Sequence, residues 1–110
     1  MNKEFEYQQG DVLFFKVDSL KENLKPVQPR NRGYVLADGE ATGHAHTICD
    51  CGNVEMYEDE NGTLFLKVTE KKESVTHEEH NTVTIEPGIY EIGIVNEYDP
   101  DEEEIRKVRD

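Results

Sequence analysis

Basic residues are scarce in this sequence. It contains 12 Lys and Arg against 25 Asp and Glu, which gives a formal net charge of −13. Nucleic acids and anionic membrane surfaces attract clustered basic side chains, so we expect no direct binding to either. The acidic balance has two interpretations. It can serve solubility, or it can form a surface that imitates nucleic acid and occupies a basic protein partner.

Long apolar runs and the commonest catalytic motifs are also missing. No segment approaches the roughly 20 apolar residues that a membrane-spanning helix needs, and the start, MNKEFEYQQGD, has no signal-peptide character. No nucleotide loop of the GxxxxGK type and no GxSxG nucleophile elbow occurs. At 110 residues the chain is long enough for one modest core. We therefore expect a single cytoplasmic domain over residues 1–110.

The coarse organisation predicts an all-β fold, either a small antiparallel barrel or a sandwich. Short runs of β-branched and aromatic residues are separated by turn signals such as Asn61-Gly62 and Glu86-Pro87-Gly88. Residues 20–32 contain two prolines and are expected to form a surface loop. The strands are expected at residues 11–17, 34–37, 54–57, 63–68, 82–85 and 89–95.

The order of charges in the C-terminal tail indicates the structure of the tail, and the alternating apolar positions of the strands indicate the core. From Asp99 the chain reads DPDEEEIRKVRD, with a proline and acids first and basic residues last, which favours a short helix. A final edge strand over residues 105–108 is the alternative. The core is expected to contain one of the pairs Val12/Phe14 and Leu13/Phe15, together with Leu64, Leu66, Val83, Ile85, Ile92 and Ile94.

All four histidines lie in two short segments, GHAH at His44 and His46 and HEEH at His77 and His80. Neutral imidazole is the commonest protein ligand for metals. Side chains at i and i+2 of a strand point to the same face, so His44 and His46 can offer two imidazoles to one ion. The hairpin between the segments is long enough to return residues 77–80 to their side. A backbone-bonded turn for the first pair and a solvated loop for the second are the alternatives.

The HEEH segment also supplies a carboxylate. His77 and His80 are three residues apart, so a turn rather than a straight strand would place both on one side. We predict a first shell of His44, His46 and one or two of His77, Glu79 and His80. Such a set suits a divalent ion of zinc, iron, manganese or nickel. Three ligands with an open position would make a catalytic site, and four would make a structural one.

Two cysteines and one glutamate are weaker candidates. Cys49 and Cys51 would face away from the histidines on an unbroken strand, whereas a bulge after Thr47 would complete a two-Cys, two-His zinc site. Thiols without a ligand role are the alternative, and a disulfide between them is disfavoured by their short spacing and a reducing cytoplasm. Glu40 could act as a general base beside a metal-bound water, or could be a turn carboxylate.

The succession QQGDVLF, GEATGHAH, HEEH, EPGIYEI and NEYDP resembles a family of small uncharacterised bacterial and phage proteins marked by QGD, GEATGHAH, HEEH and PGxY motifs. The resemblance covers roughly residues 8–108, implies no assigned activity, and does not include the two cysteines. The positions that it shares are Gln9, Gly10, Asp11, Gly39, Glu40, Gly43, His44, His46, His77, Glu79, His80, Pro87, Gly88, Tyr90, Glu97 and Tyr98.

A more distant similarity is to the cupins, which place an HxH pair and then a glutamate on strands of a small barrel. Gly39, His44, His46 and Glu55 resemble that first motif. The spacing from His46 to Glu55 is longer than in cupins, and no histidine follows Pro87-Gly88. The similarity therefore indicates a comparable arrangement of metal ligands rather than membership of the cupin superfamily.

Two classes of function follow. The first is a small metal-binding β domain with a histidine-rich site, which could be a metalloenzyme. The alternative is an acidic interaction or inhibitor protein of the phage type, acting on a larger protein partner. Metal content discriminates between them.

Overall fold

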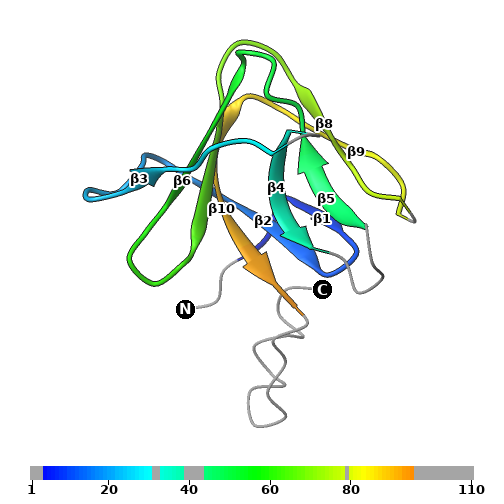
Figure 1. Cartoon of the computed structure of the whole chain (residues 1–110), viewed down its shortest axis with the longest axis horizontal. Coiled ribbons are helices and arrows are strands. Elements are labelled where there is room, and N and C mark those ends of the chain that lie inside the picture. The colour runs from blue at the N-terminus through cyan, green and yellow to red at the C-terminus, as the bar shows by residue number, and fades with distance from the viewer. Residues whose placement is uncertain (1–3, 31–32, 39–43, 79, 96–110) are drawn as a thin grey trace, which may run out of the picture.

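All the regular structure in the described part of the chain is β. The computed structural model describes residues 4–30, 33–38, 44–78 and 80–95, and these contain ten strands and no helix (Figure 1). The strands form two antiparallel sheets that pack as a sandwich without closing into a barrel. The prediction of an antiparallel β fold is confirmed. Within these residues there is no helix long and apolar enough to cross a membrane.

The two sheets differ in size and are assembled from strands distant in sequence. The larger sheet has the order β1 (Tyr7–Gln9), β2 (Val12–Val17), β10 (Gly88–Ile94), β7 (Leu64–Val68), β6 (Val54–Glu58) and β3 (Lys25–Pro26). The smaller sheet has the order β4 (Tyr34–Asp38), β5 (Ala45–Ile48), β8 (Glu73–Thr76) and β9 (Val83–Ile85). The turn at Glu86-Pro87 therefore carries the chain from the smaller sheet into the larger one.

The main core lies between the sheets, but the larger sheet is buried on its other face as well. Val12 and Phe14 belong to the main core, while Leu13 and Phe15, which alternate with them, are also buried. The sequence presented these pairs as alternatives, and the structure buries both. Leu64, Val83 and Ile94 are only partly buried. The buried residues of the core are Val12, Phe14, Leu36, Ile48, Val54, Met56, Leu66, Val68, Val75, Ile85, Tyr90 and Ile92.

The segment after β2 helps to cover that outer face. The Lys21 ammonium lies 5.4 Å from the centre of the Phe65 ring and 2.9 Å from the Asp59 carboxylate. Asp59 also accepts hydrogen bonds from the backbone N–H groups of Asn61 and Thr63, both at 2.9 Å. These bonds fix the β6–β7 turn at the predicted Asn61-Gly62 position, where Gly62 has a φ of 86°. The hairpin prediction is confirmed.

Other expectations are corrected or fall outside the described residues. The region expected to be a loop, 20–32, contains the two-residue strand β3, in which Pro26 pairs with Tyr57 at the sheet edge. Strands β1 and β8 were not expected, because neither segment shows a strong apolar alternation. The C-terminal helix or edge strand lies outside the described residues.

The antiparallel pairing of β5 with β8 positions the candidate site. Thr47 is opposite Thr76, and Ile48 is opposite Val75. Residues that precede β5 therefore meet residues that follow β8 at one end of this pair. At the other end, residues that follow β5 meet the start of β8. The histidines lie at the first end and the cysteines at the second.

Candidate metal centre

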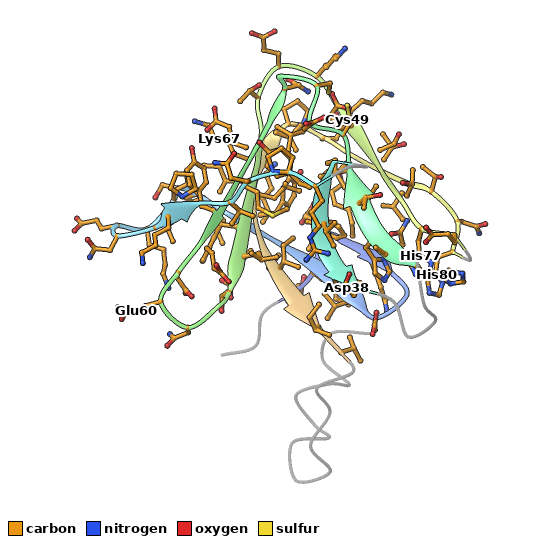
Figure 2. The ribbon with its side chains drawn as sticks, in the orientation of Figure 1. Asp38, Cys49, Glu60, Lys67, His77 and His80 are labelled. Carbon is orange, nitrogen blue, oxygen red and sulfur yellow. The ribbon has the colours of Figure 1, made fainter. Side chains whose placement is uncertain are left out.

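Three segments converge at the histidine end of the β5–β8 pair. They are the start of β5, the loop between β8 and β9, and the turn between β1 and β2. Figure 2 shows His77 and His80 beside one another near the start of β5, with Cys49 at the opposite end of that strand. We call the group formed by His44, His46, His77 and His80 the histidine cluster.

The imidazoles of the cluster are in mutual contact. The ring centre of His77 lies 4.3 Å from that of His46 and 4.6 Å from that of His80. The rings of His46 and His80 are stacked at 5.7 Å with 14° between their planes. One ligand nitrogen from each of these three residues lies within 4.8 Å of the other two. A single ion could therefore bind all three with small side-chain adjustments.

Gln9 determines which nitrogen of His46 is available. The Gln9 amide nitrogen donates to the carbonyls of Val75 at 2.8 Å and Asn81 at 2.9 Å, which uses both of its hydrogens. Its oxygen must then accept a hydrogen bond, and it lies 2.8 Å from His46 Nδ1. His46 Nδ1 therefore carries the proton, and the lone pair of the neutral ring is on Nε2. Metal-binding histidines are commonly oriented by a hydrogen bond of this kind.

The carboxylate of Asp11 faces that lone pair. His46 Nε2 lies 3.5 Å from Asp11 Oδ1, and the imidazole is only 2% exposed. Burial lowers the pKa of His46, and the charge of His77 lowers it further, although Asp11 opposes this change. A neutral His46 would place two hydrogen-bond acceptors against each other. A cation between or beside them would remove this conflict.

Gly10 lies between Gln9 and Asp11, in the β1–β2 turn, and it makes room for His80. It has a φ of +57°, in the left-handed region that favours glycine. A Cβ atom at this position would lie 2.5 Å from His80 Nε2, closer than any real contact. The close approach of backbone and imidazole therefore requires glycine, and it ties the turn to the cluster.

The structure brings most of the predicted ligands together. His44 directly precedes β5, and its ring centre lies 5.8 Å from that of His77. With His77 and Glu78 it forms a second possible ligand trio, in which Glu78 also accepts a hydrogen bond from the Ala45 N–H at 2.9 Å. The two trios share His77 and make one continuous group of five possible ligands. The candidates Glu79 and Glu40 lie outside the described residues.

The cysteines do not join this group. β5 runs without a bulge from Ala45 to Ile48, and the irregularity in its pairing lies in β4, between Val35 and Ala37. Among the described residues, no trio of possible ligands combines a cysteine with a histidine. Cys49 and Cys51 instead lie near Glu73, and both are exposed. A hydrogen bond with Cys51 is the main cause that raises the pKa of the Cys49 thiol to about 11.

The sequence assigned no role to three residues of the centre, which are Gln9, Asp11 and Glu78. Gln9 and Asp11 were noted only as positions shared with the similar family, and Glu78 was passed over in favour of Glu79. Gln9 is 2% exposed although it is polar. Its place in an otherwise ordinary QQGD turn offers no local signal, because its partners come from β5, β8 and the following loop.

Comparison with known proteins places the chain in a family without assigning it an activity. No curated protein and no solved structure matches it. The similarity to cupins stays a prediction. Residues 8–94, which include the whole histidine cluster, match the family described as "Domain of unknown function (DUF8820)". The chain belongs to this family.

Proposed function

We propose that the protein binds one divalent transition-metal ion through His46, His77 and His80. The observation that carries this proposal is the pairing of His46 Nε2 with the Asp11 carboxylate at 3.5 Å, beside two further imidazoles. Gln9 keeps the proton on Nδ1, and burial disfavours a second proton on the ring. A metal ion satisfies the lone pair and the carboxylate together.

The donor set narrows the choice of metal. Imidazole nitrogens suit zinc, iron and nickel, whereas manganese favours carboxylate and carbonyl oxygens. Three histidines match the protein ligands of catalytic zinc sites, in which a fourth position takes water or substrate. His44 and Glu78 can occupy that position or orient a group bound there, because their trio shares His77 with the first. A metal ion in such a site supplies a Lewis acid or an activated water.

The ligand residues also explain how the site would affect the fold. His46 lies on β5, whereas His77 and His80 follow β8, and Gln9 ties both to β1 of the other sheet. An ion held by these histidines would link β5 to the loop after β8 within the smaller sheet, beside the β1–β2 turn of the larger sheet. Because the ion would bind only the folded state, it would stabilise that state by about 2.7 kcal/mol at a free metal concentration of 100 times Kd.

The test is metal analysis of the full chain purified without a histidine tag. The histidine cluster should hold one equivalent of metal after loading with zinc and buffer exchange, counted in the Cys49→Ser/Cys51→Ser variant so that thiols contribute no ligand. The His46→Ala/His80→Ala variant should lose at least about 100-fold in affinity, because loss of a ligand should exceed the 10–100-fold effect of its hydrogen-bonding partners. All four histidines belong to the cluster, so the control is Cys49→Ser/Cys51→Ser, which should retain the ion. The proposal would be refuted if the Cys49→Ser/Cys51→Ser protein bound no metal, or if its affinity were unchanged when the two histidine substitutions were added and the protein remained folded.

A further inference from the structure

Three donors of a different kind meet at the opposite end of the β5–β8 pair. One ligand atom each from Cys49, Cys51 and Glu73 lies within 4.8 Å of the others. The cysteines come from the turn between β5 and β6, and the carboxylate comes from the first residue of β8. The Cys51 thiol donates a hydrogen bond to Glu73 Oε2 at 3.2 Å. The two segments are therefore already in contact through ligand atoms.

A buried asparagine holds this arrangement in place. The Asn53 side-chain nitrogen donates to the same Glu73 oxygen at 3.0 Å and to the Lys71 carbonyl. Its oxygen accepts from the Thr69 hydroxyl at 2.9 Å and from the Glu70 N–H at 2.7 Å. Asn53 is only 6% exposed, so it ties the cysteine turn to the segment before β8 from within. Ligating carboxylates are typically oriented by such hydrogen bonds.

We propose that Cys49, Cys51 and Glu73 form a second metal site, which takes a thiophilic divalent ion such as zinc or cadmium. Two thiolates and one carboxylate are a ligand set that zinc accepts, and thiolates select soft and borderline metals. On binding, each Cys–S–H bond breaks as its sulfur–metal bond forms, and the protons pass to solvent. The ion takes the place of the proton that Cys51 shares with Glu73, with no change in oxidation state.

The exposure of the site determines what could complete the coordination. Both cysteines are exposed, and a Cβ atom at the neighbouring Gly52 would meet nothing within 4 Å. Three protein ligands leave a tetrahedral ion with one position open to solvent. Water or a small thiol can reach it without movement of the backbone. This proposal does not depend on metal binding at the histidine cluster.

Cadmium titration of the reduced full chain tests the proposal, because cadmium thiolates absorb in the ultraviolet through sulfur-to-metal charge transfer and imidazole complexes lack this band. We expect the band to saturate at one equivalent, in wild-type protein and equally in the His46→Ala/His80→Ala variant.

The single variants Cys49→Ser and Cys51→Ser should each lower the saturated band by about half. Glu73→Gln should keep the band but weaken cadmium binding by at least about tenfold, because a neutral amide is a poorer ligand than a carboxylate. Glu70→Gln, a nearby substitution with the same charge change, should bind cadmium like the wild type.

Three results would overturn the site. The first is a wild-type protein whose thiols are reduced but which gives no charge-transfer band. The second is equal cadmium affinity in the Glu73→Gln and Glu70→Gln variants, because the carboxylate would then not be a ligand. The third is a band that appears only as the protein dimerises in sedimentation, because the ion would then join two chains. If the histidine cluster fails to bind metal, the charge-transfer band is unaffected, so the two proposals fail separately.

Discussion

The two ends of the β5–β8 pair offer contrasting solutions to the same problem. Each end gathers possible metal ligands from two segments that the strand pairing brings together. At the histidine end, His46 is buried and depends on a third segment, the end of β1, for its hydrogen bond. At the cysteine end the thiols are exposed, and one buried side chain, Asn53, organises the turn. A buried ligand needs a protein partner for every polar atom, whereas water can serve an exposed one.

Removal of Asn53 should have the largest effect on stability, and should damage only the cysteine end. Asn53→Ala leaves the Glu70 N–H and the Lys71 carbonyl without their present partner and frees Glu73. We expect a loss of about 3 kcal/mol in the free energy of unfolding, measured in urea. The exposed Asn61→Ala is the control, with an expected change within about 0.5 kcal/mol. If Asn53→Ala also abolishes metal binding by the histidines, the two ends are not independent.

Removal of the Gln9 amide should damage the histidine end instead. Gln9→Leu removes the Gln9 partner of His46 Nδ1 and of the carbonyls of Val75 and Asn81, so we expect a loss of about 2 kcal/mol in stability. Zinc affinity should fall about 10–100-fold, because the ring of His46 is no longer oriented. Gln8→Leu, at the exposed neighbouring position, should change zinc affinity little. Equal zinc affinities in the Gln9 and Gln8 variants would exclude Gln9 from orienting the ligand.

Substitution of Gly10 separates two effects, the free-energy cost of a side chain at positive φ and the crowding of His80 by that side chain. Gly10→Ala and Gly62→Ala both place a side chain at positive φ, which costs about 1–2 kcal/mol in each case. Only the Gly10 variant puts a methyl group against His80, so only this variant should also lower zinc affinity. The measurement is zinc titration of both variants by calorimetry. Equal affinities would show that His80 can move away without loss of binding.

The smallest expected effect is a pH dependence at the histidine end. Because burial and His77 hold the pKa of His46 below its ordinary value of 6.5, the folded metal-free protein binds this proton less readily than the unfolded chain. The free energy of unfolding should therefore fall as the pH drops below about 6.5 and level off above it, with a slope of at most about 1.4 kcal/mol per pH unit. Denaturation in the presence of a chelator measures this, with His46→Gln as the reference. An identical profile for the reference would assign the dependence to other groups.

The sequence predicted the parts of the fold that depend on neighbouring residues. Alternation in residues 64–68 and 89–94 indicated strands, and Asn61-Gly62 indicated the hairpin, because side-chain period and turn conformation are local properties. Burial of both faces of β2 was not predicted, because VLFFKV has no polar partner face and leaves the alternatives open. The proximity of the two histidine pairs was predicted from the confinement of all four histidines to two segments, the i, i+2 spacing of His44 and His46, and the length of chain between the segments.

What the sequence determined by itself is an acidic all-β chain whose histidines are confined to two segments, since composition, alternation and turn residues need no knowledge of distant contacts. The tertiary structure decided which ligands meet. The register of β5 with β8 separates the cysteines from the histidines, although GHAH and CDC are nearly adjacent in the chain. The packing of the two sheets brings Gln9 and Asp11 to His46 across 37 and 35 positions of sequence. Such partners are selected by sheet pairing and by the need to satisfy buried polar atoms, and both are properties of the assembled sandwich.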